Sequence, residues 1–444
     1  MRIELFDRKK ELKIINAKTA LGKFKIFIKP GLADNFTYLL RDFLKDCSKA
    51  LIVTDDKVFS LYREKITNIL IAFGFKYRVF KIKQGEEQKN IENTINIYKE
   101  CIDFDMHRSD VIVAFGGGVV GDLAGFAAST FHRGINFIQF PTTIIGQIDR
   151  SIGGKVGVNF NKIKNVIGNF YQPKCILIDT LLLKSLEGKE IINGLGEMVK
   201  YGIIFDKKIL KSLYNIANRL CKDGSDFLHK LITSSDFNNL IYKCCLIKTK
   251  VVIKDEFDTG YRNLLNFGHT FGHAIEKASA FSSVSHGAAV AIGMIIAADV
   301  SILAGFTNTF LRNYMLNLYK LLGLPNNIIF KNETERENFI NEIITSMKFD
   351  KKFSSSTNKF ILLKDLNKPL ITSNIELEII IKALRNNIIL DNKIINTMNN
   401  IIKWNIPLSY FYFYKMFLKI LISYYFFKLF VYYKFFKFEG SFNR

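Results

Sequence analysis

Apolar runs and helix-like segments alternate along the first half of the chain. Near-continuous apolar residues predict strands buried on both faces at 24–30, 50–56, 76–82, 111–118, 136–141 and 175–179. Between them lie stretches whose apolar residues recur at helical spacing, such as 90–104. Strands that alternate with helices indicate βαβ units built around a parallel sheet.

The pattern changes near residue 186. Helical spacing of apolar residues, with few strand signals, continues through 189–205, 240–257, 268–281 and 286–305. We therefore expect two domains and a C-terminal extension: an α/β domain over 1–185, a mostly helical domain over 186–390, and a Lys- and aromatic-rich segment over 391–444 outside the core.

The extension has the apolarity of a membrane segment, but lysines interrupt it. Between Lys415 and Lys437 the longest lysine-free run is 420–427. A spanning helix needs about 20 mostly apolar residues, so membrane contact by this segment is not expected. Its removal should leave activity intact.

Composition adds two exclusions. The 444 residues carry 63 Lys+Arg against 41 Asp+Glu, a formal charge of +22, alongside 41 Phe and a single Trp. A bias toward A/T-rich codons explains this skew, so the charge alone does not indicate a nucleic-acid partner. Six cysteines without a C-x-x-C pair, and an N-terminus without an apolar signal segment, indicate a cytoplasmic protein with reduced thiols.

A glycine-rich turn follows the strand expected at 111–116. Gly116, Gly117, Gly118 and Gly121 precede or open a helix, with Asp122 in its first turn. Glycines at a strand-to-helix turn let backbone N–H groups approach a phosphate, which the helix N-terminus also favours. The pattern GGGxxGD differs from G-x-G-x-x-G, and a tight turn serving only helix packing is the alternative.

The segment that follows is dense in small and polar residues. A polar ligand pocket is one interpretation, and an irregular surface loop is the other. The side chains that would line such a pocket are Thr142, Thr143, Asp149, Lys155, Asn159, Lys164 and Asn165.

Three of the six histidines fall close together. His269 and His273 are four residues apart, on one face if the segment is helical, and His286 follows after a loop-like stretch. Catalytic zinc takes three protein ligands and keeps one open position. Glu197 and Glu276 are the candidate acidic ligands. The spacing leaves open which histidines bind metal, which handle protons or substrate, and whether the three are unconnected.

Read together, these blocks resemble the 3-dehydroquinate synthase family. The resemblance rests on the residues at 84–89, 116–134, 141–159, 164–173, 193–204, 254–276 and 286–294, with a shorter match at 350–352. It implies a Rossmann-like NAD-binding α/β domain followed by a mostly helical metal-binding domain. It also implies zinc, with cobalt as a substitute, bound by Glu197, His269 and His286.

The resemblance assigns further residues by motif position. The catalytic and substrate-side set is Arg133, Asp149, Lys155, Lys200, Lys248, Arg262, Asn266, His273 and Lys351. The cofactor set is Asp55, Lys57, Gln84, Gly85, Glu86, Glu87, Gln88, Lys89, Gly117, Gly118, Val119, Val120, Gly121, Asp122, Thr142, Thr143, Lys155, Lys164, Leu182, Leu183, Lys184, Ser185 and Glu190.

The implied activity is a lyase reaction of the shikimate pathway. The family converts 3-deoxy-D-arabino-heptulosonate 7-phosphate into 3-dehydroquinate and phosphate by transient NAD-dependent oxidation, phosphate elimination, re-reduction and aldol closure. The expected partner is thus a small phosphorylated sugar acid, not nucleic acid, and a homodimer is expected by family analogy.

Three positions depart from the family pattern. Ile163 and Glu187 replace a usual glycine and proline, and Ala288 replaces a carboxylate beside His286. No implied metal ligand is lost, so we expect activity to be retained. The alternatives are another sugar phosphate cyclase, a metal-dependent polyol dehydrogenase, or a decayed synthase that binds membranes or polyanions.

Overall fold

The structure is a computed structural model that describes residues 12–34, 36–40, 43–71, 74–161, 163–220, 226–279, 284–349 and 359–391. The described residues up to 328 and from 334 to 389 form one compact unit. The expectations for Lys351 and for the segment beyond Asp391 lie outside the described residues.

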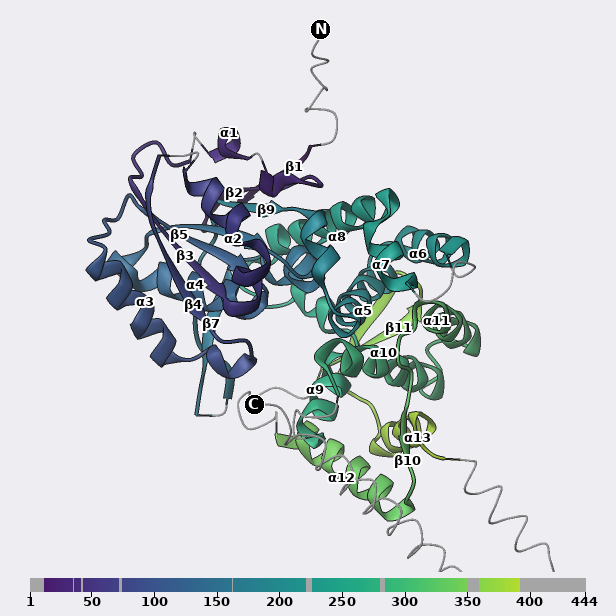
Figure 1. Cartoon of the computed structure of the whole chain (residues 1–444). Coiled ribbons are helices and arrows are strands. Elements are labelled where there is room, and N and C mark those ends of the chain that lie inside the picture. Colours follow the sequence, from purple (N-terminus) through teal and green to yellow (C-terminus); the bar gives the residue numbers. More distant parts are fainter. Residues whose placement is uncertain are drawn as a thin grey trace, which may run out of the picture. The chain divides into compact units, whose positions relative to one another are not determined.

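A seven-stranded sheet organises the first half, in the order β1-β2-β9-β6-β5-β3-β4 (Figure 1). All neighbouring pairs are parallel except β1 with β2, which form an antiparallel hairpin. The strands are β1 (Lys13–Thr19), β2 (Gly22–Ile28), β3 (Lys49–Asp55), β4 (Lys76–Ile82), β5 (Val111–Gly116), β6 (Asn136–Pro141) and β9 (Cys175–Ile178). The predicted α/β class with a mostly parallel sheet is confirmed.

Helices cover both faces of this sheet: α1 (Thr37–Leu40), α2 (Asp56–Ile71), α3 (Ile91–Asp103) and α4 (Gly118–Thr130). Side chains alternate along β3, with Ala50 and Ile52 in one apolar cluster and Leu51 and Val53 in the other. The first cluster includes Ile66 of α2, and the second includes residues of α3 and α4. Burial on both faces explains why these strands read as continuous apolar runs.

A second hairpin, which the sequence analysis did not predict, follows β6. After the π-helical turn η4 (Gly146–Arg150), β7 (Lys155–Phe160) pairs antiparallel with β8 (Ile163–Phe170). Most residues of β8 are exposed, so the strand has no buried apolar face to mark it in the sequence. The hairpin carries Lys155, Lys164 and Asn165.

The second half is mostly helical, as predicted, and packs around α10 (Figure 1). Its helices are α5 (Gly188–Ile204), α6 (Lys207–Leu220), α7 (Phe227–Thr233), α8 (Ser235–Lys254), α9 (His269–Ala278), α10 (His286–Leu303), α11 (Thr309–Leu322), α12 (Glu333–Phe349) and α13 (Leu377–Asn387). Its short strands are β10 (Ile328–Phe330), β11 (Phe360–Asp365), β12 (Lys368–Thr372) and β13 (Ile388–Leu390).

Helix α10 is apolar on all sides. By length and composition it would suffice to cross a membrane, and 78% of it is buried inside the fold. A helix that is hydrophobic all round and buried by its neighbours is the expected centre of a helical domain. Helices α5, α9, α11 and α13 pack against it.

Candidate active site

Three helices of the second half bring one carboxylate and two imidazoles together. Glu197 lies within α5, while His269 and His286 are the first residues of α9 and α10. Glu197 Oε1 lies 3.4 Å from His269 Nε2 and 3.8 Å from His286 Nε2. The candidate ligand atoms of all three lie within 4.8 Å of one another. Two imidazole nitrogens and a carboxylate oxygen are a donor set that fits a catalytic zinc ion.

Two glycines next to these residues allow the helices to approach. A Cβ on Gly287, which follows His286, would lie 2.3 Å from Asn193 Cα in α5. Gly268, which precedes His269, has φ +79°, and a Cβ there would lie 2.5 Å from Met294 Cγ in α10. Any larger residue would push the helices apart or strain the backbone. The close helix contacts therefore set the spacing of the cluster.

A second carboxylate supports His286 from the other side of the ring. His286 Nδ1 lies 3.2 Å from Glu276 Oε2, while its Nε2 faces Glu197. Charge and hydrogen bonding explain the low pKa of Glu276: burial alone would raise it, but His286, Lys164 and His273 hold it below its ordinary value. Glu276 thus gives His286 a carboxylate partner, although Ala288 stands where the family usually has a carboxylate. His273, Glu276 and His286 form a second possible metal-binding group.

Lys200 contacts the outer oxygen of Glu197. Its ammonium forms an ion pair with Glu197 Oε2, and both side chains are 2% exposed. Burial, followed by the nearby charges of Lys200, His286 and His273, holds the pKa of His269 well below its ordinary value. The His269 ring is therefore neutral near pH 7, the form that binds metal.

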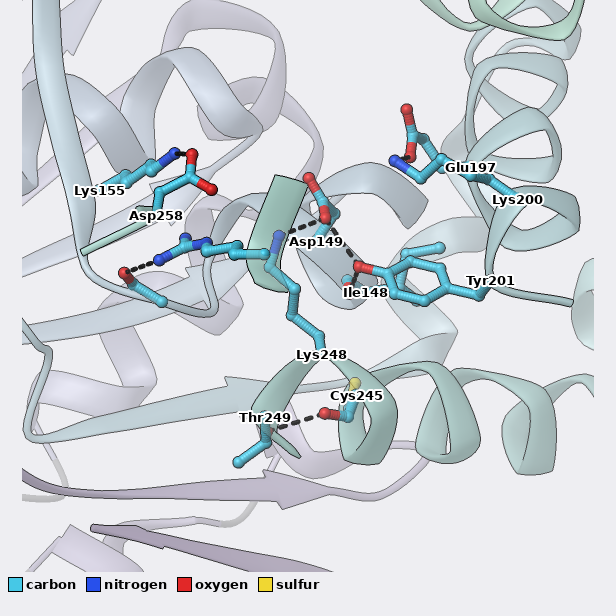
Figure 2. A network of polar contacts seen from close by, with 12 residues as sticks. Ile148, Asp149, Lys155, Glu197, Lys200, Tyr201, Cys245, Lys248, Thr249 and Asp258 are labelled. Carbon is cyan, nitrogen blue, oxygen red and sulfur yellow. Dashed lines mark hydrogen bonds and ion pairs between the residues drawn. The ribbon is translucent and has the colours of Figure 1, made fainter. Parts of the chain in front are cut away.

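Asp149 is the centre of a buried polar network (Figure 2). Its Oδ1 accepts hydrogen bonds from Lys248 Nζ at 2.5 Å and from Tyr201 Oη at 2.7 Å. Burial alone would raise the pKa of Asp149, but Lys248 and Lys200 with these hydrogen bonds hold it well below its ordinary value. Burial lowers the pKa of Lys248 to about 8, against the opposing effect of Asp149.

Lys155 and Arg262 add positive charge beside this network. Lys155 forms an ion pair with Asp258, as Figure 2 shows. The Arg262 guanidinium donates to the carbonyls of Gly153 at 3.2 Å and Glu256 at 2.8 Å. A cavity of about 540 Å³ is lined by both residues together with Asn266, Lys200, Lys248, Asp149, Glu197 and the three histidines. Its cations suit a small ligand with more than one anionic group.

A larger cavity of about 980 Å³ adjoins the first and shares six lining residues with it. Most of the predicted cofactor residues line it: Asp55, Lys57, Gln84, Gly85, Glu86, Lys89, Gly117, Gly118, Val119, Val120, Asp122, Thr142, Thr143, Lys164, Ser185 and Glu190. It lies at the carboxyl ends of β3 and β5, the edge at which parallel sheets bind nucleotides.

Lys89 organises one wall of the larger cavity. Its Nζ contacts Asp122 Oδ2 at 3.1 Å, Glu86 Oε1 at 3.1 Å and Asn165 Oδ1 at 2.6 Å. Burial raises the pKa of Asp122, while Lys89 opposes that effect. Asn165 has φ +55°, which Asn tolerates better than most residues. The hairpin, the η2 turn (Glu86–Gln88) and α4 are thus tied together at one point.

Several predicted residues lie elsewhere. Arg133 is exposed at the far end of α4 from the glycine turn and lines neither cavity. Gly121, Leu182 and Leu183 are buried in the fold away from the two cavity walls. The side chains of Glu87, Gln88 and Lys184 also lie outside the two walls. Lys155 lines the smaller cavity and not the larger one.

Among the cavity residues that the sequence analysis missed, Arg150 and Asn193 are polar and lie close to the predicted site. Arg150 lines both cavities. The only hint of this in the sequence was its position directly after Asp149, a predicted site residue. Asn193 lines the larger cavity, and its Oδ1 accepts hydrogen bonds from Ser285 Oγ at 2.6 Å and Gly287 N at 3.2 Å. Asn193 thereby ties the beginning of α10 to α5.

Comparison with known proteins identifies the family. The 3-dehydroquinate synthase N-terminal family matches residues 79–193, and its C-terminal family matches 194–353. The 3-dehydroquinate synthase of Clostridium kluyveri is 38% identical over 354 residues, 80% of this chain and 93% of that protein. The chain belongs to the 3-dehydroquinate synthase family.

Solved structures agree with this fold. The 2-epi-5-epi-valiolone synthase of Streptomyces hygroscopicus, solved with NAD⁺ and Zn²⁺ bound, has a TM-score of 0.71 at 24% identity, over 81% of this chain and 95% of that one. A 2-deoxy-scyllo-inosose synthase, complexed with carbaglucose-6-phosphate, NAD⁺ and Co²⁺, has a TM-score of 0.68 at 21% identity, over 85% of this chain and all of that one. At these identities the likeness shows the fold that the family shares.

Proposed function

We propose that this chain is a 3-dehydroquinate synthase, converting 3-deoxy-D-arabino-heptulosonate 7-phosphate into 3-dehydroquinate and phosphate. One observation carries the proposal: the Glu197–His269–His286 cluster lines a small, cation-rich cavity that adjoins a dinucleotide-sized one. A metal, a redox cofactor and a doubly anionic substrate can therefore meet in one place. Family membership supports the same conclusion.

NAD is the cofactor that the larger cavity fits. Gly117 and Gly118 leave room beside the N-terminus of α4, where backbone N–H groups favour a pyrophosphate. Asp55 at the end of β3 is a suitable partner for ribose hydroxyls. When bound, NAD would supply hydride chemistry: it would accept the hydrogen of the C5–H bond as hydride, while the C5 hydroxyl loses a proton, and would later return that hydride to C5. The protein holds it beside the smaller cavity.

Glu197, His269 and His286 are the proposed metal ligands. Nε2 of both histidines faces Glu197 Oε1, which leaves Nδ1 of His286 to donate to Glu276. A ligand histidine whose other nitrogen donates to a carboxylate is the usual arrangement in zinc sites. Held by these residues, zinc, or cobalt in its place, would supply Lewis-acid chemistry that favours deprotonation of the substrate hydroxyl. Under this assignment His273 faces the substrate.

The cations of the smaller cavity bind the anionic groups of the substrate. Lys155, Lys248 and Arg262 can donate charge-assisted hydrogen bonds to a carboxylate and a phosphate, and Asn266 adds a neutral amide. Asp149 holds Lys248, and Glu197 holds Lys200, so these ammonium groups are fixed before substrate arrives. Fixed donors hold the substrate in one reactive conformation, which lowers the barrier to each step.

The proposal includes several further assignments that rest on the sequence alone and not on the cavities described above. They are a substrate role for Arg133 and Lys351, division into domains over 1–185, 186–390 and 391–444, assembly as a homodimer, and a cytoplasmic location. Arg133 lies outside both cavities of its own chain, so a role for it would need a second subunit.

Phosphate release with product identification tests the proposal. The purified chain, given substrate, NAD and zinc, should release phosphate and form 3-dehydroquinate in equal amounts. Excess chelator should abolish both, and zinc should restore them. Glu197→Gln should be inactive, while Glu335→Gln, on the exposed surface of α12, should match the unaltered chain. Absence of phosphate release, or a cyclised product other than 3-dehydroquinate, would overturn the proposal.

A further inference from the structure

Arg150 lies at the junction of the two cavities. It is the last residue of the π-helical turn η4, directly after Asp149. Six residues line both cavities: Asp122, Ile145, Arg150, Asn165, His273 and His286. Arg150 is the one lysine or arginine among them. It can therefore contact an anionic group of a ligand bound in either cavity.

The stem of Arg150 packs against the beginning of α4. A Cβ built on Gly118 would lie 3.3 Å from Arg150 Cγ and 3.7 Å from its Cβ. Gly118 is the first residue of α4 and lines the larger cavity. Because the first N–H groups of a helix lack partners within it, this is where a phosphate is favoured. The guanidinium is thus held beside the expected phosphate cradle.

The donors of Arg150 are less engaged than those of its neighbours. Lys155 is paired with Asp258, Lys248 with Asp149, and the Arg262 guanidinium with two backbone carbonyls. Within the described part of the chain Arg150 makes no side-chain hydrogen bond. Its one ion pair, with Asp122 Oδ2, is long at 3.8 Å, and its side chain is 40% exposed.

Asp122 does not neutralise this guanidinium fully. The Asp122 carboxylate already contacts Lys89 Nζ at the shorter distance of 3.1 Å. The guanidinium stays charged: although desolvation alone would lower its pKa, Asp122 and Asp149 outweigh that effect and raise it. A planar guanidinium with open donors is well suited to two phosphate oxygens at once.

We propose that Arg150 is an additional cofactor-binding residue, which binds the pyrophosphate of the dinucleotide against the N-terminus of α4. The inference rests on the proposed use of NAD. The phosphate of the substrate is the rival ligand, because Arg150 also borders the smaller cavity. The contact with Gly118 favours the cofactor. Because Arg150 lines both cavities, binding of the cofactor would then also fix the position of this side chain where the two cavities meet.

Calorimetric titration of the zinc-loaded chain tests this inference without relying on turnover. The ligands are NAD and ADP-ribose, which has the pyrophosphate but no nicotinamide. Arg150→Gln should weaken both by a similar factor, roughly 10- to 100-fold for a lost charge-assisted contact. Arg150→Lys keeps the positive charge but not the planar, bidentate donor group, so its affinity for both ligands should fall less.

Arg108→Gln is the matched control. Arg108 is exposed in the turn before β5, at the opposite end of that strand from Gly117, so its loss removes the same charge far from the cavity. Its affinity for both ligands should equal that of the unaltered chain. Unchanged thermal unfolding of Arg150→Lys would show that any loss of binding is not loss of fold.

Three other outcomes would overturn the inference. Unchanged NAD affinity with a raised KM for substrate would assign Arg150 to the substrate phosphate. A loss seen for NAD but not for ADP-ribose would assign it to the nicotinamide half. If the affinities for NAD and ADP-ribose and the KM for substrate were all unchanged, Arg150 would bind neither the cofactor nor the substrate. Failure of the unaltered chain to bind NAD would instead refute the proposed function.

Discussion

At the scale of single residues, several lysines of the site are paired with carboxylates in advance. Lys248 is held by Asp149, Lys200 by Glu197, and Lys89 by Asp122 and Glu86. Each pair positions a donor and keeps the local charge nearly balanced before substrate arrives. The pairs explain how several lysines can share one small cavity. They also give individual residues distinct and measurable properties.

Lys248 should make substrate binding depend on pH. Its pKa of about 8 means that the ammonium is present at pH 7 and is lost as the pH rises to 9. The KM for the anionic substrate should therefore rise several-fold above pH 8, and Lys248→Arg should abolish that rise because arginine stays protonated. Steady-state kinetics between pH 6.5 and 9.5 measures this. The same rise in both proteins would contradict the assignment.

The stability effect of Lys248 runs in the opposite direction. Its pKa lies below the ordinary 10.5, so the unfolded chain binds this proton more tightly. The contribution of this group to the free energy of unfolding therefore increases as the pH rises from about 8 to 10.5. Weaker substrate binding in that window would not reflect unfolding at this residue.

Glu276 should set the metal affinity through His286. Glu276→Gln removes the carboxylate that faces His286 Nδ1, and loss of such a partner typically weakens zinc binding about 10- to 100-fold. Competition with a chelating dye measures the affinity, with Glu335→Gln as the control. If Glu276→Gln abolished binding while Glu197→Gln did not, the metal would belong to the His273–Glu276–His286 group instead.

At the scale of helices and strands, close helix contacts make the metal site. Gly196 and Gly287 bring α5 against α10, and Gly272 and Gly293 bring α9 against α10. Each proposed ligand lies next to or near one of these glycines. The ligand geometry is therefore a property of how three helices pack and not of one local motif.

Gly287→Ala should disturb the site without touching a ligand. The new Cβ would lie 2.3 Å from Asn193 Cα and 2.6 Å from its carbonyl oxygen, so α5 and α10 must separate. We expect a stability loss of about 1–3 kcal/mol, as for overpacked cores, together with weaker zinc binding. Thermal unfolding and zinc titration measure both effects.

Gly188→Ala, at the first residue of α5, is the matched control. A Cβ there would meet only Leu228 Cδ1 at 3.7 Å, an ordinary contact, and alanine favours a helix. Its zinc affinity should be unchanged. Normal zinc binding by Gly287→Ala would contradict the role assigned to this helix contact.

The elements that could be predicted carry a continuous or regularly spaced run of apolar residues in the sequence. The strands at 76–82 and 136–141 match β4 and β6, and the helix at 90–104 matches α3 closely. The edge strand β1 was missed because Asn16 and Lys18 interrupt its apolar residues, and only Ile15 and Ala17 are buried in it. The hairpin β7–β8 was missed because β8 is mostly exposed and its pairing depends on register, which single-strand patterns do not contain.

The residues of the site were predicted better than their arrangement. Spacing placed His269 and His273 on one helix but left the acidic partner open between Glu197 and Glu276. That choice depends on the contact of α5 with α10, which joins residues about 90 positions apart in sequence. Arg150 was missed because its importance comes from the junction of two cavities, which only the folded chain defines.

At the scale of the whole molecule, residues of both halves of the chain line the two cavities. The larger cavity is lined by Asp55 and Gly118 from the first half and by Glu190 and His286 from the second. The smaller one is lined by Asp149 and Lys155 as well as Lys200 and Lys248. Such a shared site lets one bound substrate reach the cofactor and the metal without leaving. Part of the net charge of +22 faces these cavities.

The central claim is that oxidation and re-reduction occur on one substrate in one closed cycle. Substrate carrying deuterium at C5 tests it most directly, with catalytic NAD, zinc and the full chain. We predict 3-dehydroquinate that retains the deuterium, release of one phosphate per product, and no lasting absorbance at 340 nm. Accumulation of reduced cofactor in step with substrate loss, or product without the deuterium, would contradict it.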